Sequence, residues 1–197
     1  GLRTRAQERG GEWVLNGSKA FITNASVAGT AVVMARTDPE KKSKGISAFI
    51  LEKGMPGFST GTPYRKLGLH ASNTAELYFD NVKVPEENLL GKRGDGFRQM
   101  LATLDSGRLG IAAMGLGGAQ GAFEEALKYA KERRAFGKPI ASFQANAFKL
   151  ADCATEIEAA RALLYKACWM KESGKEFKTL AAQAKLYCSE VMHRVVN

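Results

Sequence analysis

A change of hydrophobic period near residue 90 constrains the fold of this chain more than any other feature. Before it, apolar residues form short runs at 13–15, 21–23, 30–36, 46–51 and 75–79, separated by Asn-Gly, Asp-Pro, Lys-Gly and Pro-Gly pairs. Such runs and turn pairs are typical of β-strands. After the glycine-rich stretch at 91–96, the period becomes about 3.6, and Ala, Leu, Glu and Lys replace most of the Gly and Pro. The sequence therefore predicts an α+β chain, with a β half followed by a helical half.

Three helices are expected in the second half, at about residues 96–134, 142–172 and 175–197, with short connections at 136–139 and 173–174. Short connections make neighbouring helices antiparallel, as in an up-and-down bundle. The expected domains are residues 1–90, a β-barrel-like or orthogonal-sheet domain, and residues 91–197, the first three helices of a bundle. Within the β half, Asn16-Gly17 predicts a type I′ hairpin turn, because both residue types tolerate positive φ.

Charge and composition narrow the possible partners. Lys and Arg outnumber Asp and Glu by 29 to 20, a net charge of +9, which favours anionic partners such as phosphorylated small molecules or nucleic acid. No helix carries a basic stripe, so a nucleic acid is the less favoured of the two. No apolar run is long enough to predict a membrane span. The two histidines are too few and too far apart to predict a metal site.

The glycine-rich run at 115–121 lacks a preceding strand and the G-x-G-x-x-G spacing of a nucleotide-binding loop. It lies inside the helical period. Close packing between helices is the predicted reason for these glycines.

Several motifs resemble the acyl-CoA dehydrogenase family. The middle β-domain of that family is resembled by NGSKAFITN at 16–24, GISAFI at 45–50 and KLGLHASNTAE at 66–76. The family's linker and first bundle helices are resembled by FDNVKVP at 79–85, NLLG at 88–91, LDSGR at 104–108, ERRAFG at 132–137 and Gln144. The resemblance covers nearly the whole chain and is closest to the short-chain and short/branched-chain members.

This resemblance implies an FAD-dependent oxidoreductase of fatty acid β-oxidation. Family members remove the α-proton of an acyl-CoA with a carboxylate and pass the β-hydride to the flavin, which forms a trans-2-enoyl-CoA. The cofactor performs the redox chemistry, and the protein positions and polarises the substrate. The implied partners are acyl-CoA, an electron-transfer flavoprotein and further copies of the chain in a tetramer. The implied location is the bacterial cytoplasm or the mitochondrial matrix.

By the same resemblance, Phe21, Ile22 and Thr23 would contact the flavin, with the Phe21 ring against the isoalloxazine and the Thr23 hydroxyl near N5. An alternative is that this segment is simply a strand of aromatic and β-branched residues. The second group of FAD contacts would come from a neighbouring subunit, through Arg133, Phe136 and Gln144. Arg forks pair with phosphate oxygens, and an aromatic ring can stack on adenine. The alternative for Arg133 is a cation at the negative end of a helix dipole.

The CoA moiety would contact the segment Asp105, Ser106, Gly107 and Arg108. The alternative is an ordinary ion pair between residues three apart on one helix. No catalytic residue is expected in the chain, because the family's glutamate base would lie beyond Asn197, and the second position that some members use is occupied here by Gly107. The chain is thus expected to be an inactive fragment that also lacks the family's N-terminal helical domain. Two other functions stay open, a flavin-containing DNA-associated relative and an acyl-CoA oxidase.

Overall fold

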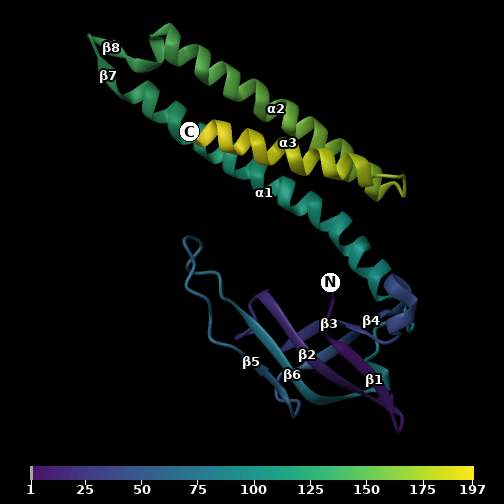
Figure 1. The fold of residues 1–197 in the computed structure, drawn as a ribbon. Coiled ribbons are helices and arrows are strands. Elements are labelled where there is room, and N and C mark those ends of the chain that lie inside the picture. Colours follow the sequence, from purple (N-terminus) through teal and green to yellow (C-terminus); the bar gives the residue numbers. More distant parts are fainter. Residues whose placement is uncertain (1) are drawn as a thin grey trace. The chain divides into compact units, whose positions relative to one another are not determined.

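A computed structural model describes residues 2–197 and confirms the α+β class (Figure 1). The chain divides into two compact units, one ending at Leu101 and the other spanning Ala102–Asn197. The first unit is built on a β-sheet, and the second is helical.

The first unit contains one six-stranded sheet. Its strands are β1 (Arg5–Arg9), β2 (Glu12–Thr23), β3 (Thr30–Arg36), β4 (Ile46–Glu52), β5 (Phe58–Thr60) and β6 (Thr74–Pro85). The spatial order is β4-β3-β1-β2-β6-β5, so the sheet is open, with β4 and β5 at its edges. Strands β1 and β3 pair in parallel, and the other neighbours pair antiparallel.

The hairpin predicted at Asn16-Gly17 is wrong. Strand β2 runs through both residues, and the chain reverses earlier, at Gly10 and Gly11, between β1 and β2. These two glycines have φ of 62° and 84°, which meets the requirement of a type I′ turn for two consecutive positive φ values. The Gly-Gly pair therefore supplies the turn that Asn-Gly was expected to make.

Asn16 and Gly17 instead form an irregularity within β2. The pairing of β2 with β6 shifts register between Leu15 and Gly17, and Gly17 has φ of 132°. The Asn16 Oδ1 accepts a hydrogen bond of 2.9 Å from the backbone N–H of Asn81 on β6. Such bulges bend a strand and change the direction of the side chains beside them.

The core of the sheet unit is formed by alternate residues of the long strands. Trp13 on β2 and Phe49 on β4 meet edge to face, with ring centroids 5.3 Å apart. The surrounding buried side chains are Leu15, Val33, Leu51, Leu77, Phe79, Val82 and Val84. This period of two is the pattern of a sheet with one buried face.

The helical unit contains α2 (Gln144–Glu172), α3 (Lys178–Val196) and the greater part of α1 (Gly96–Glu132). A two-stranded hairpin, β7 (Arg134–Ala135) and β8 (Lys138–Pro139), connects α1 to α2. The three helices lie side by side (Figure 1), which confirms the bundle expected from the sequence. Their shared core consists of Leu109, Ala112, Leu116, Ala119, Ile157, Ala160, Leu164, Ala167, Ala181, Ala184, Cys188 and Val191. The spacing of three and four residues is that of an amphipathic helix.

Two of the α1 glycines have the packing role that the sequence predicted. A Cβ atom at Gly115 would lie 3.0 Å from the carbonyl oxygen of Cys188, and one at Gly118 would lie 2.8 Å from Cε of Met192. Among the described residues, Gly117 and Gly121 have no such neighbour within 4 Å. These two lie on a different side of the same helix, and for them close packing stays a prediction.

Candidate functional site

The segment Phe21–Thr23 lies at the end of β2, where pairing with β6 shifts register between Lys19 and Ile22. Phe21 has φ of 57° and is 77% exposed, and its ring centroid lies 5.3 Å from that of Tyr64. A left-handed backbone is unusual for a bulky aromatic residue and costs about 1 to 3 kcal/mol. Strain of this kind is concentrated at functional sites, so the conformation supports a role for the Phe21 ring beyond strand propensity.

Ile22 and Thr23 line a pocket of about 460 Å³ in the sheet unit, together with Lys19. The other lining residues are largely apolar: Leu2, Ala25, Ala28, Thr30, Ala31, Val32, Val33, Met34, Phe58, Leu77 and Met100. Phe21 does not line this pocket. The structure therefore brings two of the three predicted flavin contacts into one pocket and places the third on the exposed surface beside Tyr64.

Lys19 was not predicted as a site residue, although it lies in the matching motif. Burial against the apolar wall lowers the pKa of its ammonium from 10.5 to about 8, because desolvation disfavours the charged form. No carboxylate among residues 2–197 pairs with it. Folding therefore buries a charge without compensation at neutral pH.

Replacing Lys19 with methionine is expected to stabilise the protein by about 1 to 2 kcal/mol at pH 7, as the half-buried charge is removed. The folded-state pKa is below the unfolded one, so the charge penalty is complete below pH 8 and disappears as pH rises to 10.5. Urea unfolding of both proteins between pH 6 and 10 measures this difference. Lys83→Met, at an exposed lysine of the same sheet, is the control and should change stability at pH 7 by about 0.5 kcal/mol or less. A Lys19→Met effect that is independent of pH would contradict the burial argument.

Tyr64, beside Phe21, was missed by the sequence analysis because it comes from a distant segment. Its backbone N–H donates to the carbonyl of Thr74 at 2.8 Å, which holds the segment against β6. Burial raises the pKa of Tyr64, and the nearby Glu76 carboxylate adds to the effect. The Tyr78 hydroxyl also donates a hydrogen bond to Glu76, and this hydrogen bond raises the pKa of Tyr78. Phe21 thus lies at the edge of a cluster of two tyrosines and one carboxylate.

One end of the helical unit carries Arg133, Phe136 and Gln144. The β7–β8 hairpin reverses the chain there, so the residues that follow α1 and the residue that begins α2 lie at the same end. The N–H of Ile140 donates to the carbonyl of Arg133 at 2.8 Å, and Gln144 begins α2. Phe136 is 95% exposed with φ of 50°. Both aromatic residues that were predicted to contact FAD are therefore exposed and left-handed, a shared feature that no sequence pattern indicated.

The predicted CoA-contacting segment lies in α1. Asp105 and Arg108 form the intrahelical ion pair that their spacing allows, Ser106 is half-buried, and Gly107 is exposed, with no atom within 4 Å of a Cβ placed on it. The ion-pair alternative is thus confirmed for Asp105 and Arg108. A role in binding CoA stays a prediction for all four residues.

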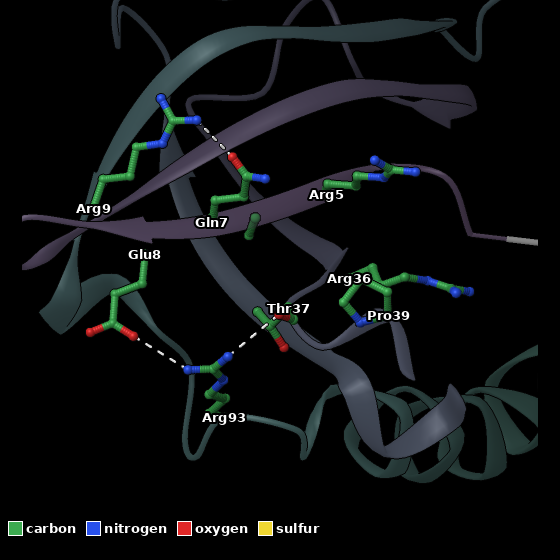
Figure 2. Close-up of a pocket in the computed structure, with 9 residues that line it drawn as sticks. Arg5, Gln7, Glu8, Arg9, Arg36, Thr37, Pro39 and Arg93 are labelled. Carbon is green, nitrogen blue, oxygen red and sulfur yellow. Dashed lines mark hydrogen bonds and ion pairs between the residues drawn. The ribbon is translucent and has the colours of Figure 1, made fainter. Parts of the chain in front are cut away.

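A separate pocket of about 440 Å³ lies beside β1 and β3 (Figure 2). Four arginines line it, namely Arg5, Arg9, Arg36 and Arg93, together with Ala6, Gln7, Glu8, Thr37 and Pro39. A second pocket, of about 570 Å³, shares Arg5, Arg36 and Pro39 and adds Leu2 and Arg3. No sequence motif pointed to this basic region.

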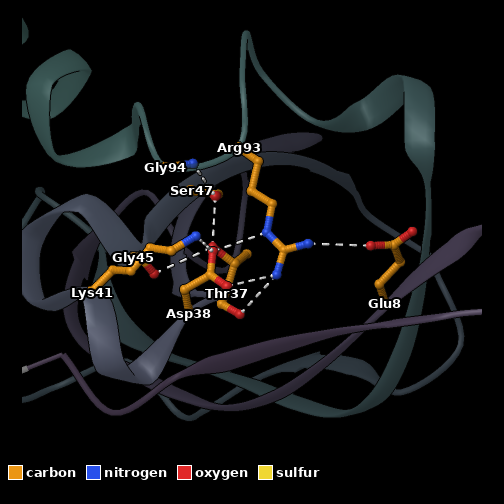
Figure 3. A network of polar contacts seen from close by, with 8 residues as sticks. All are labelled: Glu8, Thr37, Asp38, Lys41, Gly45, Ser47, Arg93 and Gly94. Carbon is orange, nitrogen blue, oxygen red and sulfur yellow. Dashed lines mark hydrogen bonds and ion pairs between the residues drawn. The ribbon is translucent and has the colours of Figure 1, made fainter.

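Arg93 is the centre of a polar network at the edge of this pocket (Figure 3). Its Nε and Nη2 donate to the two carboxylate oxygens of Asp38 at 2.9 and 2.8 Å, and its Nη1 donates to Glu8 at 3.3 Å. The hydrogen bond from Arg93 holds the pKa of Asp38 below its ordinary value. Lys41 lies 3.7 Å from the same carboxylate. Both carboxylates at this edge are therefore already paired.

Within the part of the chain that the structure describes, no helix is long and apolar enough to cross a membrane. Residues 2–197 also contain no group of three or more His, Cys, Asp or Glu side chains that could hold a metal ion.

Comparison with known families decides the relationship. Residues 1–82 match the model of the acyl-CoA dehydrogenase middle domain, and residues 94–197 match that of the acyl-CoA dehydrogenase C-terminal domain. The chain belongs to the acyl-CoA dehydrogenase family. This confirms the resemblance seen in the motifs.

Similar proteins in the acyl-CoA dehydrogenase family include butyryl-CoA dehydrogenase from Megasphaera elsdenii, whose structure is 49% identical with a TM-score of 0.94, over 99% of this chain and 51% of that one. The caffeyl-CoA reductase-Etf complex subunit CarC of Acetobacterium woodii is 46% identical over 99% of this chain and 52% of its own length. PigA, solved with FAD and proline, is 32% identical with a TM-score of 0.93, over 98% of this chain and 51% of that one. The chain spans about half the length of the curated relatives it matches.

The residues present fit the cofactor of an acyl-CoA dehydrogenase. Phe21 and Phe136 each leave a ring face uncovered for stacking. Thr23 and Arg133 are exposed residues, and neither side chain donates a hydrogen bond to a residue within 2–197. Arg134, next to it, is instead committed to the carbonyl of Gly137 at 2.7 Å. Donors and ring faces therefore remain for a molecule that carries both phosphates and aromatic rings.

Proposed function

We propose that this chain supplies flavin and acyl-CoA contacts to an FAD-dependent acyl-CoA dehydrogenase that acts on short-chain substrates. The observation that carries the proposal is the pair of exposed, left-handed aromatics, Phe21 and Phe136, at the positions where the family motifs place flavin contacts. Left-handed backbone at bulky residues is concentrated at functional sites, which supports a role for these two rings. Binding a planar cofactor provides one, because ring stacking uses the exposed faces.

Bound FAD would supply a ring that accepts the hydride from the substrate β-carbon. The Thr23 hydroxyl would donate a hydrogen bond to that ring, and Phe21 would cover one of its faces. In a neighbouring subunit, Arg133 would pair with pyrophosphate oxygens and Phe136 would stack on adenine, while Gln144 would donate to the same region. Charge-assisted guanidinium–phosphate bonds are about twice as strong as neutral ones, so Arg133 would be the strongest single contact. The assembly would be a homo-oligomer, by family resemblance a tetramer.

The base that removes the α-proton is not proposed among residues 2–197. Gly107 has no side chain, and Asp105 lies two residues from it, which turns its side chain about 200° around the helix. Asp105 is also paired with Arg108. A general base must come within hydrogen-bond reach of the proton that it takes. We therefore assign this step to the glutamate that most family members carry near the C-terminus.

The proposed product is a trans-2-enoyl-CoA, and the proposed electron acceptor is an electron-transfer flavoprotein. The short-chain assignment is supported by the likeness to butyryl-CoA dehydrogenase, and the acceptor is supported by the relative named as part of an Etf complex. The bacterial cytoplasm or the mitochondrial matrix would suit such a pair of proteins.

Arg133→Ala in the complete protein is expected to weaken FAD binding roughly 10- to 150-fold, which corresponds to the loss of about 1.5 to 3 kcal/mol of charge-assisted hydrogen bonding. The measurement is the flavin content after gel filtration, followed by titration of the apoprotein with FAD.

Arg134→Ala is the matched control, since the Arg134 side chain already donates to Gly137. It removes the same charge one residue away and should leave FAD affinity within about threefold. Equal losses in the two variants would indicate a general electrostatic effect rather than a pyrophosphate contact. Full flavin retention by Arg133→Ala would refute the assignment of Arg133.

A further inference from the structure

The basic region between β1 and β3 has no role in the function proposed above. Arg5 and Arg36 are register partners in the parallel pairing of these strands. Neighbouring strands are about 4.8 Å apart, so the two side chains leave the sheet as immediate neighbours. In Figure 2 both guanidinium groups extend in the same direction, and Arg36 lies beside Pro39. Like charges on adjoining side chains repel each other unless a counter-charge lies near them.

Among the described residues that line this region, no unpaired carboxylate supplies that counter-charge. Glu8 is the one acidic residue among the described residues that line the two adjoining pockets, and it is paired with Arg93. Asp38, the next nearest, accepts two hydrogen bonds from Arg93. Arg3, Arg5 and Arg36 make no ion pair with any residue in 2–197. The region therefore has a local excess of positive charge.

Arg36 adds a second, independent observation. Its Nε is buried and has no hydrogen-bond acceptor in the described chain, although its backbone N–H is fixed by the Thr4 carbonyl at 2.8 Å. Buried donors are almost always satisfied, and an unsatisfied one in a native fold calls for an explanation. Because this Nε is closed off from solvent, a bound molecule would reach it only with a shift of the Arg36 side chain.

We propose that Arg3, Arg5 and Arg36 form a binding site for a compact, multiply charged phosphate group, separate from the contacts assigned to the flavin. A guanidinium presents paired N–H donors in the geometry of phosphate oxygens, and two adjacent guanidinium groups favour a ligand with more than one negative charge. The small number of residues that line the pocket beside Arg3, Arg5 and Arg36 favours a small anion over an extended acidic peptide. The phosphate could be a free inorganic ion or the terminal group of a larger molecule.

The test is isothermal titration of the 197-residue chain with inorganic pyrophosphate, at low ionic strength because salt screens exposed charges. Saturable binding with one site per chain is expected. Arg5→Gln and Arg36→Gln should each weaken it about tenfold or more. Arg65→Gln, which removes an exposed charge elsewhere in the same unit, should change it less than threefold. Circular dichroism and thermal unfolding of each variant verify that the fold is retained.

Two further titrations distinguish a free phosphate ion from the terminal phosphate of a larger molecule, and a phosphate ligand from an acidic peptide. Coenzyme A and pyrophosphate should compete with each other if the site takes terminal phosphates of larger molecules, whereas binding of pyrophosphate alone would limit the site to free ions. Tighter binding of a glutamate oligomer than of pyrophosphate would overturn the proposal in favour of an acidic peptide. Absence of saturable binding, or an equal loss in Arg65→Gln, would also overturn it. Because no flavin is involved, these outcomes are independent of whether the dehydrogenase function is correct.

Discussion

Gly45→Ala is expected to destabilise the protein by about 3 kcal/mol or more. Gly45 is buried immediately before β4, and a Cβ placed on it would lie 1.8 Å from the carbonyl oxygen of Asp38 and 2.8 Å from its carbonyl carbon. The clash is with backbone, which cannot move aside by changing a rotamer. The Gly45 carbonyl also accepts from the N–H groups of Thr37 and Asp38 at 2.8 and 3.1 Å, so the two chain segments are tied together.

Urea unfolding of the two proteins, compared at equal slope, measures the difference. Gly29→Ala is the matched control, because a Cβ there meets no atom within 4 Å and the residue lacks the positive φ that an alanine would strain. Its effect should stay within about 1 kcal/mol. If Gly45→Ala were as stable as Gly29→Ala, the close approach of the two segments would not exist in solution.

Phe49→Ala should cost about 3 to 5 kcal/mol, the range for removing a buried phenylalanine from a well-packed core. Phe49 is 0% exposed and meets the Trp13 ring edge to face. Its removal opens a cavity at the centre of the sheet unit and also forfeits the aromatic contact, which contributes about 0.5 to 1.5 kcal/mol beyond burial. Strand β4, which carries Phe49, is paired with β3 along its whole length and cannot collapse freely into the gap.

Differential scanning calorimetry of Phe49→Ala, beside wild type, gives this value. Phe148→Ala is the control, since Phe148 is largely exposed on α2 and should lose about 0.5 kcal/mol or less. Phe49→Leu should lie between wild type and Phe49→Ala, because it retains part of the buried volume. A Phe49→Ala protein as stable as the Phe148→Ala protein would mean that Phe49 is not part of the core.

The sequence predicted the helical unit well because its period persists over long windows. The three helices begin and end within a few residues of expectation. Strand β1 was missed, since Arg-Ala-Gln-Glu-Arg contains a single buried residue, Ala6, and therefore shows no alternation. The position of β1 between β2 and β3 depends on which strands it pairs with, and a short stretch of sequence does not contain that information.

The sequence predicted which residues belong to the candidate site but not the backbone conformation of those residues. Motif resemblance selected Phe21 and Phe136, but their left-handed backbones arise from a register shift in β2 and from the turn of the β7–β8 hairpin. Spacing predicted the pair of Asp105 and Arg108, since both residues lie on one helix. Arg5 and Arg36 could not be paired from sequence, because a parallel contact between separate strands brings them together.

The strand order also affects how fast the sheet unit can fold compared with the helical unit. Most contacts in the helical unit join helices that follow one another through short connections, and such local contacts form early, with little loss of chain entropy. Some strands of the sheet pair with the next strand in the chain, as β1–β2 and β3–β4 do, but β6 must pair with β2 across the whole intervening chain, with Gly17 opposite Phe79. Until β6 inserts, β2 presents an unpaired edge rich in apolar side chains. The sheet unit therefore passes through a slower stage in which it is vulnerable to association with other chains, whereas the helical unit does not share that delay.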